Sequence, residues 1–499
     1  MSSDLVECLV ETLNCEGICY CHWKSNYSLV QALSGETDLD LLVDRQSIAQ
    51  TTTILSELGF KPATVIWGPS TPSIYHYYGY DPSIAQLVHV HLFGHVLTGE
   101  SFVKSHLFPF ETMLLENTYN LGQIRLASKS AELILFTLRM FIKYGSLLDL
   151  IYIFRKSEDI KAELRWLMSG SDMSEVLCLL KRYCPVIDPD LFVKCIDTLN
   201  TNSSLGDRII LAQLVRRRLS IYQKYTPWKR FLVYVQLLWG QLKHRLADNK
   251  KNKMLCAGGA VIAIVGPEAT GKSTLVKESE RWLGNIFTVR TVHAGKPPST
   301  WLTAPLNMFL PFIRSGLPGL RTNRLEGHIS SDAPDQSPGR KEGLTSLVYA
   351  IRSVVLAWDR RHLLVKVWRA ATNGEIVICD RYPSEEVGAM DSPRLQENLT
   401  GRGLRGTLYN WLARLEGRLY KQIPPPDVVL RLNVSIETAK KRNRERVKSG
   451  KEADAYVESR HRQSRGWQRS GTKRIYDINT EQSLPETIRS VKEGIWESL

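Results

Sequence analysis

One segment, residues 261–274, constrains the fold of this chain more than any other. It opens with five consecutive apolar residues rich in β-branched side chains, which is typical of a strand buried in a parallel sheet. The pattern Gly-x-x-x-x-Gly-Lys-Ser follows directly at 266–273, and a helical pattern begins at Thr274. We therefore expect a strand, a glycine-bounded loop and a helix in succession, as at the start of a parallel α/β domain.

The loop at this strand end has the spacing of a phosphate-binding loop. Backbone amides at a helix N-terminus favour anions, so such a loop would hold the phosphates of ATP. The expected nucleotide-binding residues are Gly266, Pro267, Glu268, Ala269, Thr270, Gly271, Lys272, Ser273 and Thr274. Lys272 would reach the β- and γ-phosphates, and the Ser273 hydroxyl would bind Mg²⁺. The alternative is a tight strand-to-helix turn that binds nothing.

The 499 residues suffice for two to four domains, and their charge is unevenly spread. Residues 1–100 contain 3 Lys or Arg and 11 Asp or Glu, a net charge of −8. Residues 201–250 contain 10 and 2, and residues 401–450 contain 12 and 4, so each of these segments has a net charge of +8. Acidic and basic segments indicate separate modules, and the basic ones suit a nucleotide, nucleic acid or anionic lipid.

Three parts are predicted from the residue patterns, and the fold class is α/β. Residues 1–126 combine helical and alternating strand patterns, so we expect an α+β domain. Residues 127–250 are expected to form a helical domain or connector, followed by a polar, glycine-ended linker. Residues 259–499 alternate between strands and helices, which predicts a parallel sheet with flanking helices.

Four further features of residues 259–499 occur in an informative order. They are an acid inside the loop, Glu268; a helical segment, 355–360, ending in Arg360; a buried strand ending in Asp380-Arg381-Tyr382; and a basic helix at 440–448. With the loop, they resemble the thymidylate kinase family over about 240 residues, half of the chain. The resemblance implies a P-loop kinase fold and the use of ATP and Mg²⁺.

The resemblance also implies a role for each of four residues. Asp380 would organise Mg²⁺, and Arg381 would hold the phosphate of the acceptor by a bidentate contact. Glu268 would contact the sugar hydroxyl of the acceptor, and Arg360, or its neighbour Arg361 one register on, would face its base and phosphate. For each residue the alternative is an ordinary loop, helix-surface or strand-end ion pair.

A lid arginine is implied by the same resemblance. Members of this family place an assisting arginine either in the loop or in the lid. Since Ala269 stands where a loop arginine would be, the lid is expected to supply it, from Arg442, Arg444 or Arg446. A basic, solvent-exposed helix face is the alternative for any one of them.

The acceptor is left open by two departures from the family. About forty-six residues rich in Pro, Gly and Arg, 299–344, stand where a simple thymidylate kinase has a short loop, and the residues after Tyr382 also differ. We expect a phosphotransferase whose acceptor is a nucleotide or a phosphorylated sugar. Two alternatives are a bifunctional enzyme that also transfers nucleotidyl groups, and an ATP-gated regulatory protein with a degenerate first domain, in a polysaccharide-related pathway.

The segment 33–43 carries two carboxylates, Asp38 and Asp40, at strand spacing. It resembles the metal-binding strand of the nucleotidyltransferase superfamily, with Lys24 at a phosphate-contacting position. Active relatives generally have a third carboxylate on a later strand, where this chain has His89 and His91. Either His89 acts as a ligand in its place, or metal binding is weakened; solvated acids at a strand end are the third reading.

Basic and aromatic residues are interleaved through 216–245. This pattern fits contact with an anionic membrane surface, or a core helix with a basic exposed face. Nucleic-acid binding is not favoured, because the chain contains no recognised nucleic-acid motif. No signal peptide or spanning segment is predicted, so a cytoplasmic location is expected, with peripheral membrane contact as an option. Thymidylate kinases are commonly dimers, so a homodimer is a further expectation.

Overall fold

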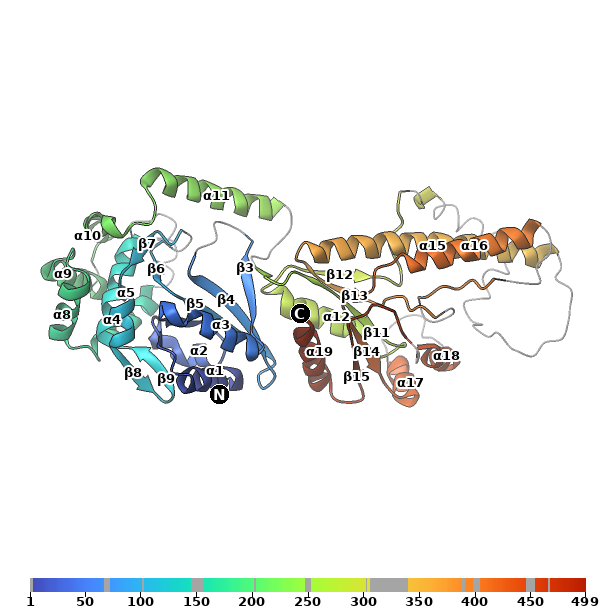
Figure 1. The fold of residues 1–499 in the computed structure, drawn as a ribbon, viewed down its shortest axis with the longest axis horizontal. Coiled ribbons are helices and arrows are strands. Elements are labelled where there is room, and N and C mark those ends of the chain that lie inside the picture. The colour runs from blue at the N-terminus through green and yellow to red at the C-terminus, as the bar shows by residue number, and fades with distance from the viewer. Residues whose placement is uncertain are drawn as a thin grey trace. The chain divides into compact units, whose positions relative to one another are not determined.

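The computed structural model describes residues 3–66, 72–100, 103–144, 157–201, 203–246, 253–301, 303–305, 340–386, 391–397, 404–445, 454–464 and 467–499. The chain divides into two compact units, Met1–Cys256 and Ala257–Leu499 (Figure 1). Each unit has its own sheet and its own core, so each is described by itself. None of the described helices is long and apolar enough to cross a bilayer.

The first unit is built on a mixed eight-stranded sheet in the order β10-β3-β4-β5-β2-β1-β9-β8. β2 pairs in parallel with β5, β1 pairs in parallel with β9, and the other pairings are antiparallel. The strands are β1 (Tyr20–His22), β2 (Leu39–Val43), β3 (Lys61–Val65), β4 (Ile74–Asp81), β5 (Gln86–Phe93), β8 (Thr118–Leu121), β9 (Ile124–Ala127) and β10 (Lys253–Leu255). A separate hairpin consists of β6 (Val96–Thr98) and β7 (His106–Phe108).

Helices cover both faces of this sheet, which is why β2 is buried along its whole length. Leu39, Leu41 and Val43 point into one core, while Leu42 points into the other, as the twofold period of a strand requires. The helices are α1 (Asp4–Cys15), α2 (Leu29–Leu33), α3 (Ile48–Glu57), α4 (Glu111–Glu116), α5 (Lys129–Tyr144), α7 (Ser157–Met168), α8 (Met173–Tyr183), α9 (Pro189–Asn200), α10 (Leu205–Arg218) and α11 (Pro227–Leu246). Three short 3₁₀ turns, η1 (Asn26–Ser28), η2 (Arg45–Ser47) and η3 (Leu219–Tyr222), complete the unit.

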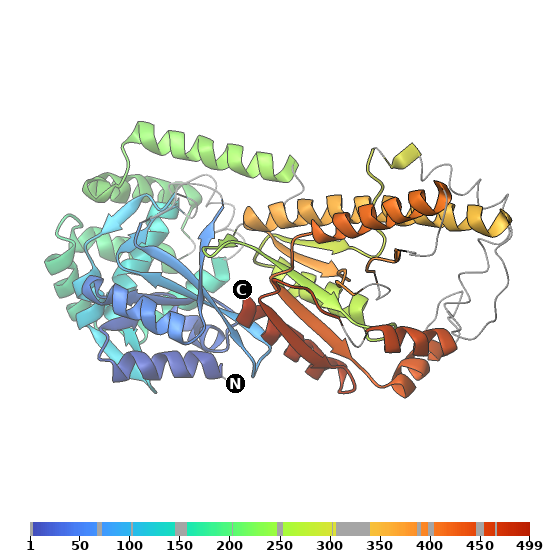
Figure 2. The same ribbon diagram turned by 45° about the vertical axis from the view of Figure 1, so that its right-hand side comes forward.

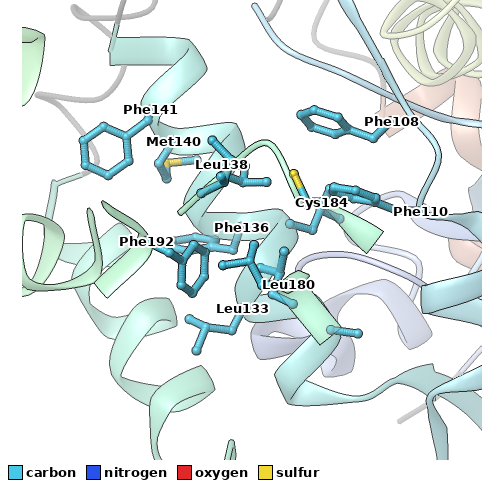
Figure 3. Close-up of a cluster of buried hydrophobic side chains, with 14 of the residues drawn as sticks. Phe108, Phe110, Leu133, Phe136, Leu138, Met140, Phe141, Leu180, Cys184 and Phe192 are labelled. Carbon is cyan, nitrogen blue, oxygen red and sulfur yellow. The ribbon is translucent and has the colours of Figure 1, made fainter. Parts of the chain in front are cut away.

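The helical segment predicted at 127–250 is helical, but most of it shares a core with the strands before it. Along α5 nearly every residue is buried, and its apolar side chains share one core with Phe108, Phe110 and residues of α8 and α9 such as Leu180 and Phe192 (Figure 3). The core continues through Val215 of α10 to Leu219. The predicted separate helical domain is therefore part of the first compact unit, because α5 cannot be removed without opening the core of the sheet.

The second unit confirms the predicted parallel sheet with flanking helices. Its five strands run in the order β12-β13-β11-β14-β15, and every pairing is parallel. They are β11 (Ala260–Val265), β12 (Val289–His293), β13 (Ile376–Asp380), β14 (Val428–Asn433) and β15 (Arg474–Asn479). β11 is central and fully buried, as its apolar sequence predicts.

Helices lie on both faces of this sheet (Figures 1 and 2). α12 (Lys272–Gly284) and α19 (Leu484–Ser498) cover one face, and α15 (Arg340–Thr372) and α16 (Leu404–Lys421) run side by side over the other. α17 (Ile436–Glu445) and α18 (Asp454–Ser464) pack on each other beyond β14. Most of the segment 299–344, where the sequence departs from a simple thymidylate kinase, lies outside the described residues.

Candidate functional site

The glycine-rich loop joins the carboxyl end of β11 to α12, as predicted. Three of its residues have positive φ: Gly266 (153°), Ala269 (64°) and Gly271 (87°). A Cβ atom at Gly266 would lie 2.8 Å from the Leu432 carbonyl oxygen, so only glycine fits this approach to β14. Gly271 caps the N-terminus of α12. Successive amides in such a turn form a concave anion site at the positive end of a helix.

Lys272 is buried inside this loop. Its ammonium donates hydrogen bonds to the carbonyl oxygens of Gly266, at 3.0 Å, and of Pro267. These bonds hold the cation against the loop, where phosphate oxygens would be its stronger partners because they are charged. Ser273 and Thr274 are exposed in the first turn of α12, so their hydroxyls are accessible. Thr270 instead is buried and donates to the Pro267 carbonyl at 3.0 Å.

Asp380 ends β13 and lies next to the loop, because it pairs in register with Ile264 of β11. One carboxylate oxygen lies 3.0 Å from Nδ1 of His293 at the end of β12. The other, Oδ1, is buried and has no hydrogen-bond partner. A buried carboxylate oxygen without a partner is costly, so a cation or its water shell is the fitting occupant. The residues present therefore fit Mg²⁺, which Asp380 and Ser273 would hold.

Arg381 connects the strand end to the loop. Its guanidinium lies 2.8 Å from Glu268 Oε1 and 3.4 Å from Asp391 Oδ2. Its φ of 75° is unusual for a residue with a side chain, and its amide donates to the Ile264 carbonyl at 3.0 Å. Gly295 leaves room for this side chain, since a Cβ there would lie 2.8 Å from Arg381 Cδ.

The charges around Glu268 keep it ionised. Burial raises the pKa of Glu268, but Lys272 and Arg381 outweigh burial and lower it overall. Burial likewise raises the pKa of Asp391, and Arg360 and Arg381 outweigh it. Two arginines and two carboxylates thus form an alternating chain, Arg360–Asp391–Arg381–Glu268, that ends in the phosphate-binding loop.

Arg360 forms one end of this chain of ion pairs and is enclosed by protein atoms. It has no exposed surface, and its donors are used by protein atoms. It donates to the carbonyls of Ala294 at 2.9 Å and Gly295 at 3.2 Å, to the carbonyl and carboxylate of Asp391 at 2.8 and 3.0 Å, and to the Tyr420 hydroxyl. These bonds hold the segments of Ala294, Asp391 and Tyr420 together in this structure, and contact of Arg360 with an acceptor stays a prediction.

The predicted lid arginines are placed differently from one another. Arg442 donates to the Thr480 carbonyl at 2.7 Å, and Arg444 pairs with Asp454. Arg446 lies outside the described residues. A small apolar contact among Ala269, Ala439 and Val457 brings α17 and α18 against the loop itself, as expected for a lid.

Several residues at the site were not indicated by the sequence. Asp391 and Tyr420 belong to segments without a motif. His293 is recognised as a neighbour of Asp380 only because β12 pairs with β13 in the structure. On α18, His461 Nε2 lies 3.1 Å from the Glu268 carbonyl oxygen, and the positive charge of Arg460 helps to lower the pKa values of Glu268 and Asp391. A basic run after the predicted lid helix was the available signal for Arg460.

In the first unit, the carboxylates of Asp38 and Asp40 each have protein partners. His89 Nδ1 lies 2.6 Å from Asp38 Oδ1, while Lys24 Nζ lies 2.8 Å and His91 Nδ1 3.2 Å from Asp40 Oδ1. Burial raises the pKa of Asp38, but His89 outweighs it and lowers the value to about 2. The two acids are thus ionised at neutral pH, and the structure brings together the residues that the resemblance singled out.

Around these carboxylates, the contact between Lys24 and Asp40 is an ion pair, whereas the histidine contacts are hydrogen bonds. Burial lowers the pKa of His91 to about 4 and that of His76 to about 2, so both are neutral at pH 7. His76 Nδ1 lies 3.1 Å from His89 Nε2. Over the part of the chain that the structure describes, no group of three or more His, Cys, Asp or Glu is arranged to hold a metal ion.

Comparisons with known proteins find little similarity. No protein-family model and no curated protein matches the chain. Two similar solved structures are deoxyadenosine kinases from M. mycoides. One, with dCMP and a flexible dCDP bound, is 17% identical, with 47% of this chain and 97% of that chain covered and a TM-score of 0.27. The other, with bound dATP, is 16% identical, with 47% and 98% covered and a TM-score of 0.28. The fold assignment rests on the strand order and loop geometry above.

Proposed function

We propose that the second unit transfers the γ-phosphoryl group of ATP to a small acceptor, in the manner of a nucleoside monophosphate kinase. The observation that carries this proposal is the convergence of three features at the carboxyl ends of β11 and β13. These are the phosphate-binding loop with Lys272, the unpartnered oxygen of Asp380, and the Arg381–Glu268 pair. Open α/β sheets bind their ligands at this edge.

Each residue has a role in positioning and in charge stabilisation, which are the main requirements of phosphoryl transfer. The loop amides and Lys272 bind the β- and γ-phosphates. Ser273 and Asp380 would hold Mg²⁺, which neutralises phosphate charge when bound. Arg381 presents a planar guanidinium between loop and acceptor, suited to a phosphate group, and Glu268 orients an acceptor hydroxyl.

The acceptor class follows from Arg381. The partly exposed guanidinium of Arg381 is paired with two carboxylates. A phosphate group offers charged oxygens in the same geometry and can replace them, which favours a phosphorylated acceptor over an uncharged one. We therefore propose a nucleoside monophosphate, with thymidylate as the first candidate from the family resemblance and a sugar phosphate as the second.

The test is transfer from γ-labelled ATP with Mg²⁺, using the full chain and a panel of nucleoside monophosphates and sugar phosphates. Lys272→Ala is expected to lower kcat by about 100-fold or more, because one charge-assisted contact to the transferring group is lost. Lys277→Ala, which changes an exposed lysine on the same helix, is the matched control and should retain activity. Full activity of Lys272→Ala with its fold intact would refute the proposal.

A further inference from the structure

The helix α11 carries large apolar side chains on its outside. Six of them are between 43% and 69% exposed: Trp228, Phe231, Leu232, Val235, Leu238 and Trp239. They follow helical spacing, so they form one stripe along the helix. Val233, which is 6% exposed, lies off this stripe. The helix therefore leaves this apolar stripe exposed.

Further large apolar side chains are exposed on the elements that precede α11. On α10, Ile210 and Leu214 are exposed, and so is Ile221 in the turn that follows. Soluble monomers rarely expose contiguous apolar surface of this kind without a binding role. The stripe is thus a candidate interaction surface, and the surrounding charge indicates what it binds.

The segment of the chain that carries this surface has charges of one sign only. Residues 208–247 contain nine Lys or Arg and no Asp or Glu. Arg217, Arg218 and Lys229 are exposed within the described part of this segment. The first hundred residues of the same unit have a net charge of −8, so the basic character is local. An apolar stripe with aromatic residues, bordered by cations, is complementary to an anionic lipid surface.

We propose that α11 and the basic segment before it bind in the plane of an anionic bilayer, with the α11 stripe among the acyl chains and the cations at the headgroups. A bilayer offers negative charge above an apolar layer over any area, whereas a folded partner would need both in register with this stripe. Tryptophan is enriched at the membrane–water interface, which fits Trp228 and Trp239, and phenylalanine is common on the apolar face of helices that lie in the membrane plane, which fits Phe231. This inference does not depend on the proposed kinase activity.

The test is sedimentation of the full chain with vesicles of phosphatidylcholine alone and of an equal mixture of phosphatidylcholine and phosphatidylglycerol. Binding is expected to the mixed vesicles and to weaken as salt is added. Trp228→Ser/Phe231→Ser/Leu238→Ser should lower binding by about tenfold or more, since the buried apolar area is lost. Arg217→Gln/Arg218→Gln should lower it by roughly fivefold for each charge removed.

The matched control is Val30→Ser/Leu121→Ser, which removes two exposed apolar side chains elsewhere in the same unit and should bind like the wild type. Thermal unfolding of every variant verifies that it is folded. If the serine variant is unfolded, the arginine variant still tests the proposal. Absence of binding to mixed vesicles would overturn the proposal. So would light scattering that shows a dimer converted to a monomer by the serine substitutions, since the stripe would then be an interface between copies.

Discussion

Arg360 is fully buried in the structure, whereas the family resemblance implies contact with the acceptor, and a measurement distinguishes the two roles. A fully buried guanidinium bonded to Asp391, Tyr420 and two carbonyls stabilises the fold, so Arg360→Met leaves the carboxylate of Asp391 short of a buried partner. Breaking a buried pair in this way costs about 3–5 kcal/mol. We expect that loss in the urea unfolding free energy of the second unit.

The control is Arg369→Met, which changes an exposed arginine on the same helix and should cost less than about 0.5 kcal/mol. If Arg360→Met kept full stability and only raised the KM for the acceptor, Arg360 would be a substrate contact as the family implies. The sequence motif could not predict the contacts of Arg360, because motif spacing places the residue on the correct helix but does not show what surrounds its guanidinium.

Glu132 in the first unit predicts a pH dependence of stability. It is fully buried on α5, where it accepts hydrogen bonds from the backbone and side-chain nitrogens of Asn26. Burial raises its pKa to about 8, and the neighbouring charge of Glu163 adds to the rise. At pH values between the ordinary carboxyl pKa and about 8, Glu132 is protonated in the folded chain and ionised in the unfolded chain. Glu132 therefore makes folding less favourable as the pH rises through this range.

Glu132→Gln isolates this effect, because an amide does not titrate in this range while other groups titrate equally in both proteins. The unfolding free energy of the variant relative to the wild type should increase from pH 5 to pH 8 by up to about 1.4 kcal/mol per pH unit. Chemical unfolding at several pH values measures the difference. A constant difference over this range would mean that Glu132 is ionised in the fold.

At the scale of elements, the entry into β11 tests how closely the second unit is packed. A Cβ atom at Gly259 would lie 2.0 Å from the carbonyl oxygen of Glu375, which begins the approach to β13. Gly259→Ala must therefore move backbone, and we expect it to destabilise the unit by about 1–3 kcal/mol.

The same substitution at Gly417 should have the opposite sign. Gly417 lies within α16, and a Cβ there would meet no atom within 4 Å. Gly417→Ala is expected to stabilise the unit by up to about 1 kcal/mol, because alanine has the higher helix propensity. Urea unfolding measures the free energy of unfolding of both variants. Equal changes at the two positions would contradict the close approach of Glu375 to Gly259.

Elements with strong local patterns were predictable, and those defined by contacts across the chain were not. The strand and loop at 261–273 follow from apolar residues, glycines and a lysine in fixed spacing. Asp391 could not be predicted as a partner of Arg360 and Arg381, because only the folded chain brings these segments together. The apolar spacing of α5 likewise indicated a helix but not that it completes the core of the strands before it.

The whole molecule consists of two compact units with separate cores, so heating is expected to give two calorimetric transitions. ATP with Mg²⁺ should raise only the transition of the second unit, since the phosphate-binding loop belongs to it. At a hundredfold excess over Kd the stabilisation is about 2.7 kcal/mol, which for a unit of this size is a rise of roughly 5–10 °C in Tm. Lys272→Ala should remove this rise in Tm and leave the transition of the first unit unchanged. Asp40→Asn removes the charge that pairs with Lys24, so it should lower the Tm of the first unit only. A single transition that responds to both substitutions would mean that the two units unfold as one, and phosphate binding by the loop would then be coupled to the ion pairs of the first sheet.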